Sequence, residues 1–190
     1  MANSKIIIVE GAQGAGKTTI TDFIRNSIPY TNLYRLNGTA DSSPSGKEKS
    51  KKMYLGLIDY MKTLENSSIN LLFDRTFFTE EVYCRLGFKE YSFTDLYEEL
   101  LESLSKLDFE IYYLTLYLSD ENEFEKRLLR EGKADVKYAK FKKESSIEQQ
   151  NMYLKIADEI SEKYPNINVI KLDNMQPIEE TQQRIKELLS

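Results

Sequence analysis

A glycine-rich segment that joins an apolar run to an amphipathic run constrains this chain more than any other feature. Residues 5–9 read Lys-Ile-Ile-Ile-Val, and a continuous β-branched run of this kind is typical of a strand covered on both faces, as in a parallel sheet. From Lys17 onward, apolar residues recur at the spacing of an amphipathic helix, which we expect to end near Pro29. The first unit along the chain is therefore a strand, a glycine loop and a helix.

The glycine loop reads Gly11-Ala-Gln-Gly-Ala-Gly-Lys-Thr18 and satisfies the pattern G-x-x-x-x-G-K-[ST]. Glycines let the backbone curl around an anion, and the N-terminus of the following helix adds its positive end. Lys17 is expected to reach the β and γ phosphates, and the Thr18 hydroxyl suits Mg²⁺, which shares its oxygen ligands with phosphates. We predict a bound nucleoside triphosphate, ATP, with Mg²⁺, held by Gly11, Ala12, Gln13, Gly14, Ala15, Gly16, Lys17, Thr18 and Thr19.

Strands and helices alternate along the rest of the chain. Apolar periodicity predicts strands at residues 33–36, 69–73, 111–118 and 167–172. It predicts helices at residues 52–64, 79–86, 94–107, 147–163 and 178–189, and one more that starts at Asp120 or Asn122 and ends near Gly132. Such alternation favours an α/β fold in which helices cover both faces of an open, mainly parallel sheet.

Residues 37–50 interrupt this pattern with glycines, a proline and four serines. A segment of this composition is predicted to be a mobile loop. No repeat or interdomain linker is apparent, and 190 residues is the length of one globular domain. We therefore expect a single domain over residues 1–190.

The composition excludes several classes of protein. The chain has no histidine and a single cysteine, Cys84, which excludes an intramolecular disulfide, the usual zinc sites and Ser-His or Cys-His catalytic pairs. A net charge of −5 argues against a broad surface for nucleic acid. No apolar run approaches the roughly 18 residues of a membrane span, and no signal-peptide pattern follows Met1. We expect a cytoplasmic protein without a membrane or nucleic-acid partner.

Arginines at strand ends indicate a second candidate site. Arg35 ends the second predicted strand, and Asp74 and Arg75 follow the third. Because ligands of an open parallel sheet gather at the carboxyl ends of its strands, these residues should share a rim with the glycine loop. An arginine fork holds two phosphate oxygens at once, so we predict that an acceptor phosphate binds here. The plainer alternative is a set of ion pairs at strand ends.

Two further arginines, Arg127 and Arg130, lie on one face of a predicted helix and lead into a lysine-rich stretch. They are expected to belong to a lid, about residues 127–145, that brings positive charge to a phosphoryl group in transfer and excludes water. The alternative is that they pair with carboxylates of their own helix, such as Glu123.

Aromatic residues follow the Asp-Arg pair at Phe77, Phe78, Tyr83 and Phe88. A place in the core is the simpler interpretation for any one of them. A planar base nevertheless needs an apolar slot, and this segment should line the crevice of the acceptor. We therefore predict that Phe77 and Tyr83 contact the substrate.

The glycine loop alone does not decide the class, because motors, switches and kinases share it. The guanine-reading motif N-K-x-D is absent and the chain is short for a motor, which leaves small kinases. Nearly the whole chain resembles the nucleotide and nucleoside kinase group, most of all the thymidylate kinase family. Residues 9–19 are similar to that family's E-G-x-x-G-x-G-K-T-T, Phe73-Asp74-Arg75 to its D-R motif, and Lys126-Arg127 with Arg130 to the segment before its lid.

The resemblance implies a core of five parallel strands with a helical lid, the donor ATP with Mg²⁺, and a deoxynucleoside monophosphate as acceptor. It implies that Lys17 holds the transferred phosphoryl group, that Thr18 and Asp74 serve the metal, and that Arg75 holds the acceptor phosphate. Arg127 and Arg130 would stabilise the transition state. If the acceptor were a nucleoside 5′-hydroxyl, Asp74 would instead accept its proton, as the matching carboxylate does in deoxynucleoside kinases.

The chain also departs from the thymidylate kinase pattern. Gln13 stands where an acidic residue is common, Thr76 replaces a common tyrosine, and residues 34–39 are only faintly similar to Arg-Glu-Pro-Gly-Gly-Thr. Our leading hypothesis is an ATP-dependent deoxynucleoside monophosphate kinase, with thymidylate-type pyrimidine nucleotides favoured. The alternatives are a deoxynucleoside kinase, a nucleotide-gated binding module and, disfavoured by the net acidity, an enzyme that phosphorylates nucleic-acid ends. Related kinases often pair through helices beside the second and third strands, which suggests a homodimer.

Overall fold

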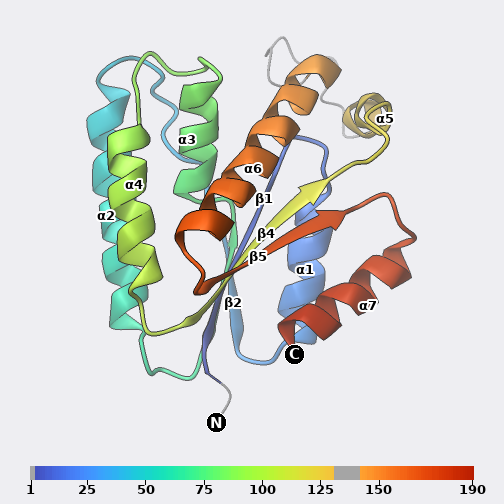
Figure 1. Cartoon of the computed structure of the whole chain (residues 1–190), viewed down its shortest axis with the longest axis horizontal. Helices are drawn as coiled ribbons and strands as arrows, with labels where there is room; N and C mark the ends of the chain where they lie inside the picture. The colour runs from blue at the N-terminus through green and yellow to red at the C-terminus, as the bar shows by residue number, and fades with distance from the viewer. Residues whose placement is uncertain (1–2, 131–141) are drawn as a thin grey trace.

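The fold is built on one parallel sheet (Figure 1). The computed structural model describes residues 3–130 and 142–190. Its strands are β1 (Lys5–Gly11), β2 (Thr31–Arg35), β3 (Asn70–Asp74), β4 (Glu110–Tyr117) and β5 (Ile167–Asp173). Neighbouring strands are all parallel and follow the order β2-β3-β1-β4-β5. The predicted parallel sheet is confirmed, with five strands in the described part of the chain.

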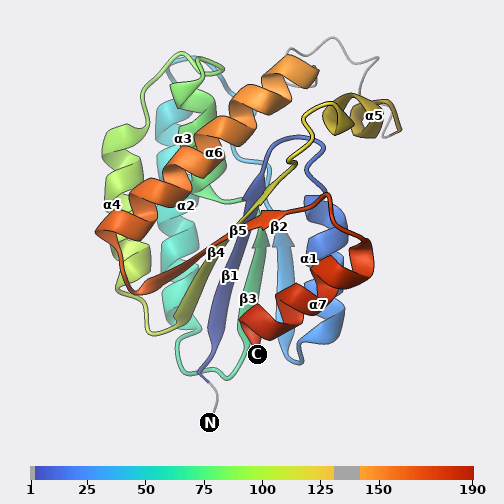
Figure 2. The ribbon, with the colours of Figure 1, turned by 45° about the vertical axis from the view of Figure 1, so that its right-hand side comes forward.

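Helices connect the strands and cover both faces of the sheet (Figures 1 and 2). They are α1 (Lys17–Ser27), α2 (Gly46–Thr63), α3 (Phe77–Arg85), α4 (Thr94–Ser105), α5 (Glu123–Arg130), α6 (Lys143–Lys163) and α7 (Ile178–Leu189). One face packs against α1 and α7, and the other against α2, α3, α4 and α6. This is the predicted three-layer α/β/α arrangement.

The central strand β1 is buried on both faces, as its β-branched run predicts. Ile6 and Ile8 belong to the core under α2, α3, α4 and α6. Ile7 and Val9 belong to the core under α1 and α7. All four side chains have no exposed surface, because successive residues of a strand point to opposite faces.

The carboxyl ends of the strands form the edge on which the candidate site lies. In the register of the sheet, Asp74 at the end of β3 is the Cα partner of both Val9 in β1 and Arg35 in β2. The glycine loop follows β1 at the same edge, and α5 lies beyond the end of β4 (Figure 1). The glycine loop, the ends of β2 and β3, and α5 are distant in the sequence and lie at this edge.

The loop expected at residues 37–50 is shorter than predicted. Helix α2 begins at Gly46, so that residues 46–50 are helical. The Asp41 carboxylate organises the approach to this helix by accepting hydrogen bonds from the Ser43 amide at 2.9 Å, the Ser45 hydroxyl at 2.7 Å and the Lys49 ammonium at 2.6 Å. Composition does not reveal these hydrogen bonds, although aspartate and serine side chains commonly form such bonds in turns.

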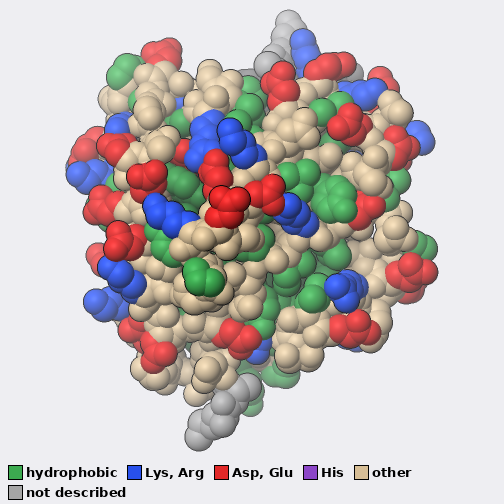
Figure 3. Space-filling view, in the orientation of Figure 1, with side chains coloured by type: hydrophobic (Ala, Val, Ile, Leu, Met, Phe, Trp, Pro, Cys, Tyr) green, Lys and Arg blue, Asp and Glu red, His purple; other side chains and the backbone are tan. Residues whose placement is uncertain are grey.

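Other boundaries differ less. Helix α6 begins at Lys143, one turn before the predicted start, and α5 is described as far as Arg130. Most of the predicted lid, together with the predicted helix end near Gly132, lies outside the described residues. No helix in the described ranges combines the length and the apolar character that a membrane crossing requires. On the face shown in Figure 3, acidic and basic side chains are interspersed rather than gathered by sign.

Replacing Ile7 tests the two-sided burial of β1. We expect Ile7→Ala to lower the free energy of unfolding by about 2–5 kcal/mol, because a fully buried side chain would leave a cavity in a packed core. Ile178 is 47% exposed at the start of α7, so Ile178→Ala should change the free energy of unfolding by less than about 0.5 kcal/mol. Urea unfolding of both variants measures the difference, and equal effects would contradict this account of the core.

Candidate functional site

The phosphate loop, residues 11–18, turns the chain sharply between β1 and α1. Gly14 and Gly16 have φ angles of 88° and 97°, in the left-handed region that favours glycine. A Cβ on Gly16 would also clash with the end of the Asn174 side chain. Gly16 also caps α1, so a glycine is needed where the loop enters the helix.

Lys17, the first residue of α1, folds back over the loop. Its ammonium donates hydrogen bonds to the carbonyl oxygens of Gly11 at 2.8 Å and of Ala12 at 2.9 Å. The residue is buried, with 6% of its surface exposed. A positive charge is thereby held at the open N-terminus of a helix, which is the combination that binds phosphate groups.

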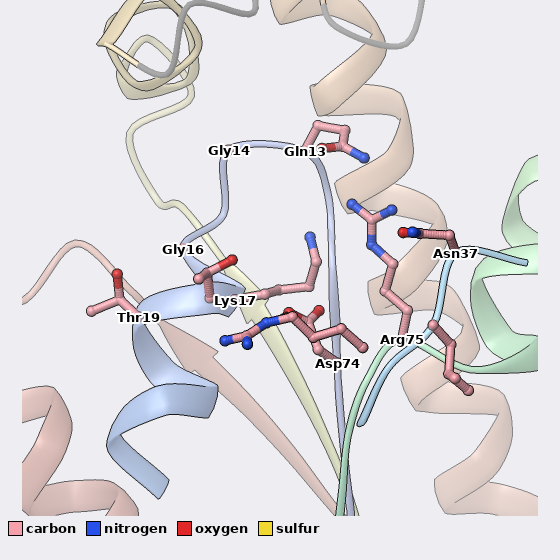
Figure 4. Close-up of a pocket in the computed structure, with 11 residues that line it drawn as sticks. Gln13, Gly14, Gly16, Lys17, Thr19, Asn37, Asp74 and Arg75 are labelled. Atoms are coloured by element: carbon pink, nitrogen blue, oxygen red, sulfur yellow. Dashed lines mark ion pairs between the residues drawn. The ribbon is translucent and has the colours of Figure 1, made fainter. Parts of the chain in front are cut away.

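A first cavity of about 530 Å³ opens beside this loop (Figure 4). The structure brings into it predicted residues from three separate segments of the chain. Its lining consists of Gln13, Gly14, Gly16, Lys17, Thr18, Thr19, Arg35, Leu36, Asn37, Asp74 and Arg75. The remaining loop residues Gly11, Ala12 and Ala15 do not line it, and both alanines pack in the core beneath the loop. Three cationic side chains against one carboxylate suit an anionic ligand.

Arg35 and Asp74 pair within the first cavity. The Arg35 Nε lies 3.5 Å from an Asp74 carboxylate oxygen, and another guanidinium nitrogen lies 2.6 Å from the Asp22 carboxylate. Asp74 is buried, whereas the Arg35 side chain is 44% exposed. The ion pairing that we weighed as the plainer alternative is therefore present, and it holds Arg35 on the side of the phosphate loop.

Arg75 stands at the junction of the site. Its φ angle is 72°, an uncommon conformation for a residue with a side chain, and its backbone N–H donates to the Val9 carbonyl at 3.1 Å. Figure 4 shows the guanidinium pointing toward the phosphate loop, between Gln13 and Asn37. Among the described residues, no carboxylate lies within ion-pair distance of it. Backbone strain of about 1–3 kcal/mol at such a position is typical of functional sites.

A second cavity of about 600 Å³ lies on the other side of Arg75. It shares Asn37 and Arg75 with the first cavity. The rest of its lining is Gly38, Thr39, Ala40, Ser42, Thr79, Glu80, Tyr83, Phe88 and Lys89. The chain thus places two ligand-sized hollows side by side, with one arginine belonging to both.

Of the two aromatic residues predicted to contact the substrate, Tyr83 lines a cavity and Phe77 is buried in the core. Tyr83 lines the second cavity, where its ring centroid lies 5.4 Å from that of Phe88. Phe77 has no exposed surface and stacks on Phe78 with a centroid separation of 4.5 Å. The prediction for Phe77 was wrong, because at the first turn of α3 its side chain faces the core between helices and sheet.

The structure does not bring Arg127 or Arg130 into either cavity. The Arg127 guanidinium donates to the carbonyl oxygens of Ala15 at 3.3 Å and of Asn174 at 2.9 Å, so it supports the back of the phosphate loop. The Arg130 side chain is 70% exposed and approaches Glu123 at 4.0 Å. Their action on a transition state stays a prediction, since most of the lid lies outside the described residues.

Helix α6 supplies contacts to the phosphate loop that the sequence analysis missed. The Ser146 hydroxyl donates to the Gln13 carbonyl at 2.9 Å, and the Gln149 side chain accepts from the Gln13 amide at 3.2 Å. One turn further, the Tyr153 hydroxyl lies 2.8 Å from that of Thr79. These polar residues recur at helical spacing on one buried face, and that periodicity is the signal that could have revealed them.

Glu10, at the end of β1, is a buried carboxylate beneath the site. It accepts hydrogen bonds from the Thr76 amide at 2.8 Å and the Thr79 hydroxyl at 2.6 Å. Burial raises its pKa from 4.5 to about 7, against the lowering effect of these hydrogen bonds and of the charges on Lys17 and Arg75. The sequence analysis gave Glu10 no role, because it follows an uninterrupted apolar strand.

The raised pKa of Glu10 predicts a pH dependence of stability. Between pH 4.5 and about 7 the folded protein holds a proton that the unfolded chain has lost, so the free energy of unfolding falls as the pH rises through this window. The full difference is roughly 3 kcal/mol. Glu10→Gln keeps a hydrogen-bond acceptor without the charge, and we expect it to be more stable than wild type at pH 8 and nearly equal at pH 5.

Urea unfolding at the two pH values measures this effect. The exposed Glu125 on α5 provides the control, because Glu125→Gln should change the free energy of unfolding by the same amount at both pH values. A Glu10→Gln protein that is less stable than wild type at pH 8 would show that the carboxylate is needed in its charged form.

Comparison with solved structures places this fold among known ones. Thymidylate kinase from Candida albicans is similar to it with a TM-score of 0.68 and 14% sequence identity, over 100% of this chain and 92% of that one. Deoxyadenosine kinase from M. mycoides with bound dCTP is similar with a TM-score of 0.59 and 18% identity, over 97% and 98% of the two chains. The structure of the same enzyme with dCMP and dCDP is similar with a TM-score of 0.57 and 17% identity, over 97% of each chain.

No protein-family model matches the chain, and a comparison with curated proteins finds no match. At these identities the likeness concerns the fold. The predicted fold of the nucleotide and nucleoside kinase group is confirmed.

Proposed function

We propose that this protein is an ATP-dependent kinase that transfers the γ-phosphoryl group of ATP to a deoxynucleoside monophosphate. The observation that carries the proposal is the pair of cavities that meet at Arg75, one beside the phosphate loop and one beyond it. A phosphoryl transfer needs a donor and an acceptor held end to end. Thymidylate kinase and deoxyadenosine kinase, which share the fold, support this class of reaction.

The first cavity is assigned to the triphosphate of ATP. The phosphate loop surrounds the β and γ phosphates, and Lys17 turns from the loop carbonyls toward them. Thr18 and Asp74 line the same cavity and offer a hydroxyl and a carboxylate to Mg²⁺. In the described ranges no group of three His, Cys, Asp or Glu side chains is placed to hold a metal ion, which fits an ion that takes most of its ligands from phosphates and water. When bound, Mg²⁺ neutralises charge on the phosphates.

Arg75 is assigned to the acceptor phosphate. An oxygen of that phosphate attacks the γ-phosphorus, the bond to the β–γ bridging oxygen breaks, and the products are ADP and a nucleoside diphosphate. The attacking oxygen is already anionic, so no general base is required. Lys17 and Arg75 bring positive charge to the phosphoryl group in transfer, and predicted help from Arg127 and Arg130 would add to it.

The second candidate function is a deoxynucleoside kinase, and Asp74 is the residue that favours it. This carboxylate lines the first cavity next to Arg75 and could accept the proton of a 5′-hydroxyl. The monophosphate acceptor is favoured by Arg75, which has no carboxylate within ion-pair distance among the described residues and would lack a counterion opposite an uncharged nucleoside. A nucleotide-gated binding module would give the second cavity no role, and the homodimer stays a prediction.

A panel of acceptors tests the proposed function. With ATP and Mg²⁺, we expect at least one deoxynucleoside monophosphate to yield its diphosphate faster than any nucleoside yields a monophosphate. Lys17→Ala should lower turnover by at least about 100-fold, because the developing charge loses a preorganised cation. Lys62, which is exposed near the end of α2, gives the control Lys62→Ala.

Product formation is followed by chromatography, and thermal unfolding confirms that both variants are folded. Phosphorylation of nucleosides alone would establish the second candidate instead. No product from any nucleotide or nucleoside would refute both.

A further inference from the structure

The second cavity contains a buried carboxylate that the proposed reaction does not use. Glu80 lies on α3 with 2% of its surface exposed, and it lines this cavity. A charged group in such a place needs partners, because burial of an unpaired charge is costly. The two oxygens of the Glu80 carboxylate differ in the number of partners that they have.

One oxygen of Glu80, Oε1, has all the partners. It accepts hydrogen bonds from the Ser50 hydroxyl at 3.1 Å and from the Tyr91 hydroxyl, and the Lys89 ammonium lies 3.7 Å away. Lys89 in turn donates to the Thr39 carbonyl at 2.7 Å. These contacts come from α2 and from the connection between α3 and α4, so the carboxylate is fixed in one orientation.

The other oxygen, Oε2, accepts no hydrogen bond from the described residues. It is not among the side-chain oxygens that are sealed from solvent without a partner. It lies 3.0 Å from the position that a Cβ on Gly38 would occupy, and Gly38 also lines the cavity. A fixed, anionic hydrogen-bond acceptor is thus presented at the wall of the proposed acceptor pocket.

We propose that Glu80 is the specificity-determining residue of this pocket and that it selects an acceptor whose base carries an exocyclic amino group. The inference rests on the proposed function, since it takes the second cavity as the acceptor site. It replaces the preference for thymidylate that the sequence resemblance suggested. Cytosine is the pyrimidine that meets the requirement.

The chemistry of the bases gives the reason. The amino group of cytosine projects beyond the ring and donates hydrogen bonds, which a carboxylate oxygen accepts. Uracil and thymine place a carbonyl oxygen at the same position, and its lone pairs would repel the carboxylate. Their ring N–H is flanked on both sides by carbonyl oxygens, so it cannot approach Oε2 without bringing one of them close. A site with a buried polar group rejects the analogue that leaves it unpaired.

The surroundings of Glu80 suit a base. Tyr83 and Phe88 supply aromatic surface in the same cavity, whose volume is within the usual range of ligand pockets. Arg75 lies in the wall that this cavity shares with the first one. A nucleotide with its phosphate at Arg75 therefore has room to extend its base toward Glu80.

The test compares dCMP with dUMP, which differ only at the N3–C4 edge of the base. With ATP and Mg²⁺, we expect kcat/KM to be higher for dCMP by roughly 10- to 100-fold, the discrimination that one hydrogen bond to a charged group supports. In Glu80→Gln the side-chain amide can also donate to a carbonyl oxygen, so we expect the ratio to fall by at least about 10-fold while dUMP turnover is kept or rises. If nucleosides prove to be the acceptors, deoxycytidine and deoxyuridine replace the two nucleotides.

The neighbouring Glu81 gives a matched control. It is a buried carboxylate on the same helix, but it pairs with Arg85 at 2.7 Å and lines neither cavity. Glu81→Gln should leave the dCMP to dUMP ratio unchanged, even if it lowers stability. Thermal unfolding of both variants separates loss of fold from change of preference.

Each outcome bears on a separate claim. Phosphorylation with dUMP or dTMP equal to or better than dCMP would overturn the role of Glu80 and leave the proposed function standing. A purely structural role of Glu80 predicts that Glu80→Gln lowers both rates alike, and this result would also overturn it. Absence of product with every acceptor would instead refute the proposed function.

Discussion

The whole site depends on the position of Arg75, and the hydrogen bond from the backbone N–H of Arg75 to the carbonyl of Val9 fixes that position. It holds the end of β3 against the end of β1, so that Arg75 leaves the sheet beside the phosphate loop. Arg75 has a left-handed backbone, α3 begins two residues later at Phe77, and residues of α3 line the second cavity. Because a residue with a side chain adopts this conformation only at a cost, the surrounding sheet and helices must hold it in place.

The phosphate loop is supported from two sides. Arg127 and Asn174 contact the carbonyl of Ala15, while Ser146 and Gln149 contact the backbone of Gln13. Side chains from α5, from α6 and from the segment after β5 therefore meet at one short loop. A loop built from glycines has little rigidity of its own, and these contacts provide it. The N-terminus of α1 can then present its amides to phosphate groups without first being ordered.

Much of this arrangement could be predicted from the sequence, because it depends on short patterns of neighbouring residues. The β-branched run of residues 5–9 identified a strand buried on both faces, and the motif at residues 11–18 identified the phosphate loop. The position of Arg75 after a predicted strand placed it at the correct edge of the sheet. These signals depend only on neighbours in the chain.

The features that were missed depend on contacts between distant segments. Phe77 and Tyr83 lie on one short helix, and only the packing of α3 decides which of them faces the core and which the cavity. Glu10 directly follows the apolar run in the sequence, and nothing near it shows that it accepts hydrogen bonds from two threonines more than sixty residues away. Likewise, nothing near Glu80 in the sequence shows that Ser50, Tyr91 and Lys89 occupy one of its oxygens and leave the other open.

The central claim is that two ligands bind end to end across Arg75, and the binding of a joined ligand tests it most directly. Calorimetry would compare ATP, a deoxynucleoside monophosphate and a compound in which adenosine and the deoxynucleoside are linked through a polyphosphate chain. If the two cavities form one continuous site, the linked compound should bind at least about 100-fold more tightly than either part alone, since the second contact becomes intramolecular. Arg75→Ala should remove most of that gain. A linked compound that binds no more tightly than ATP would contradict the account.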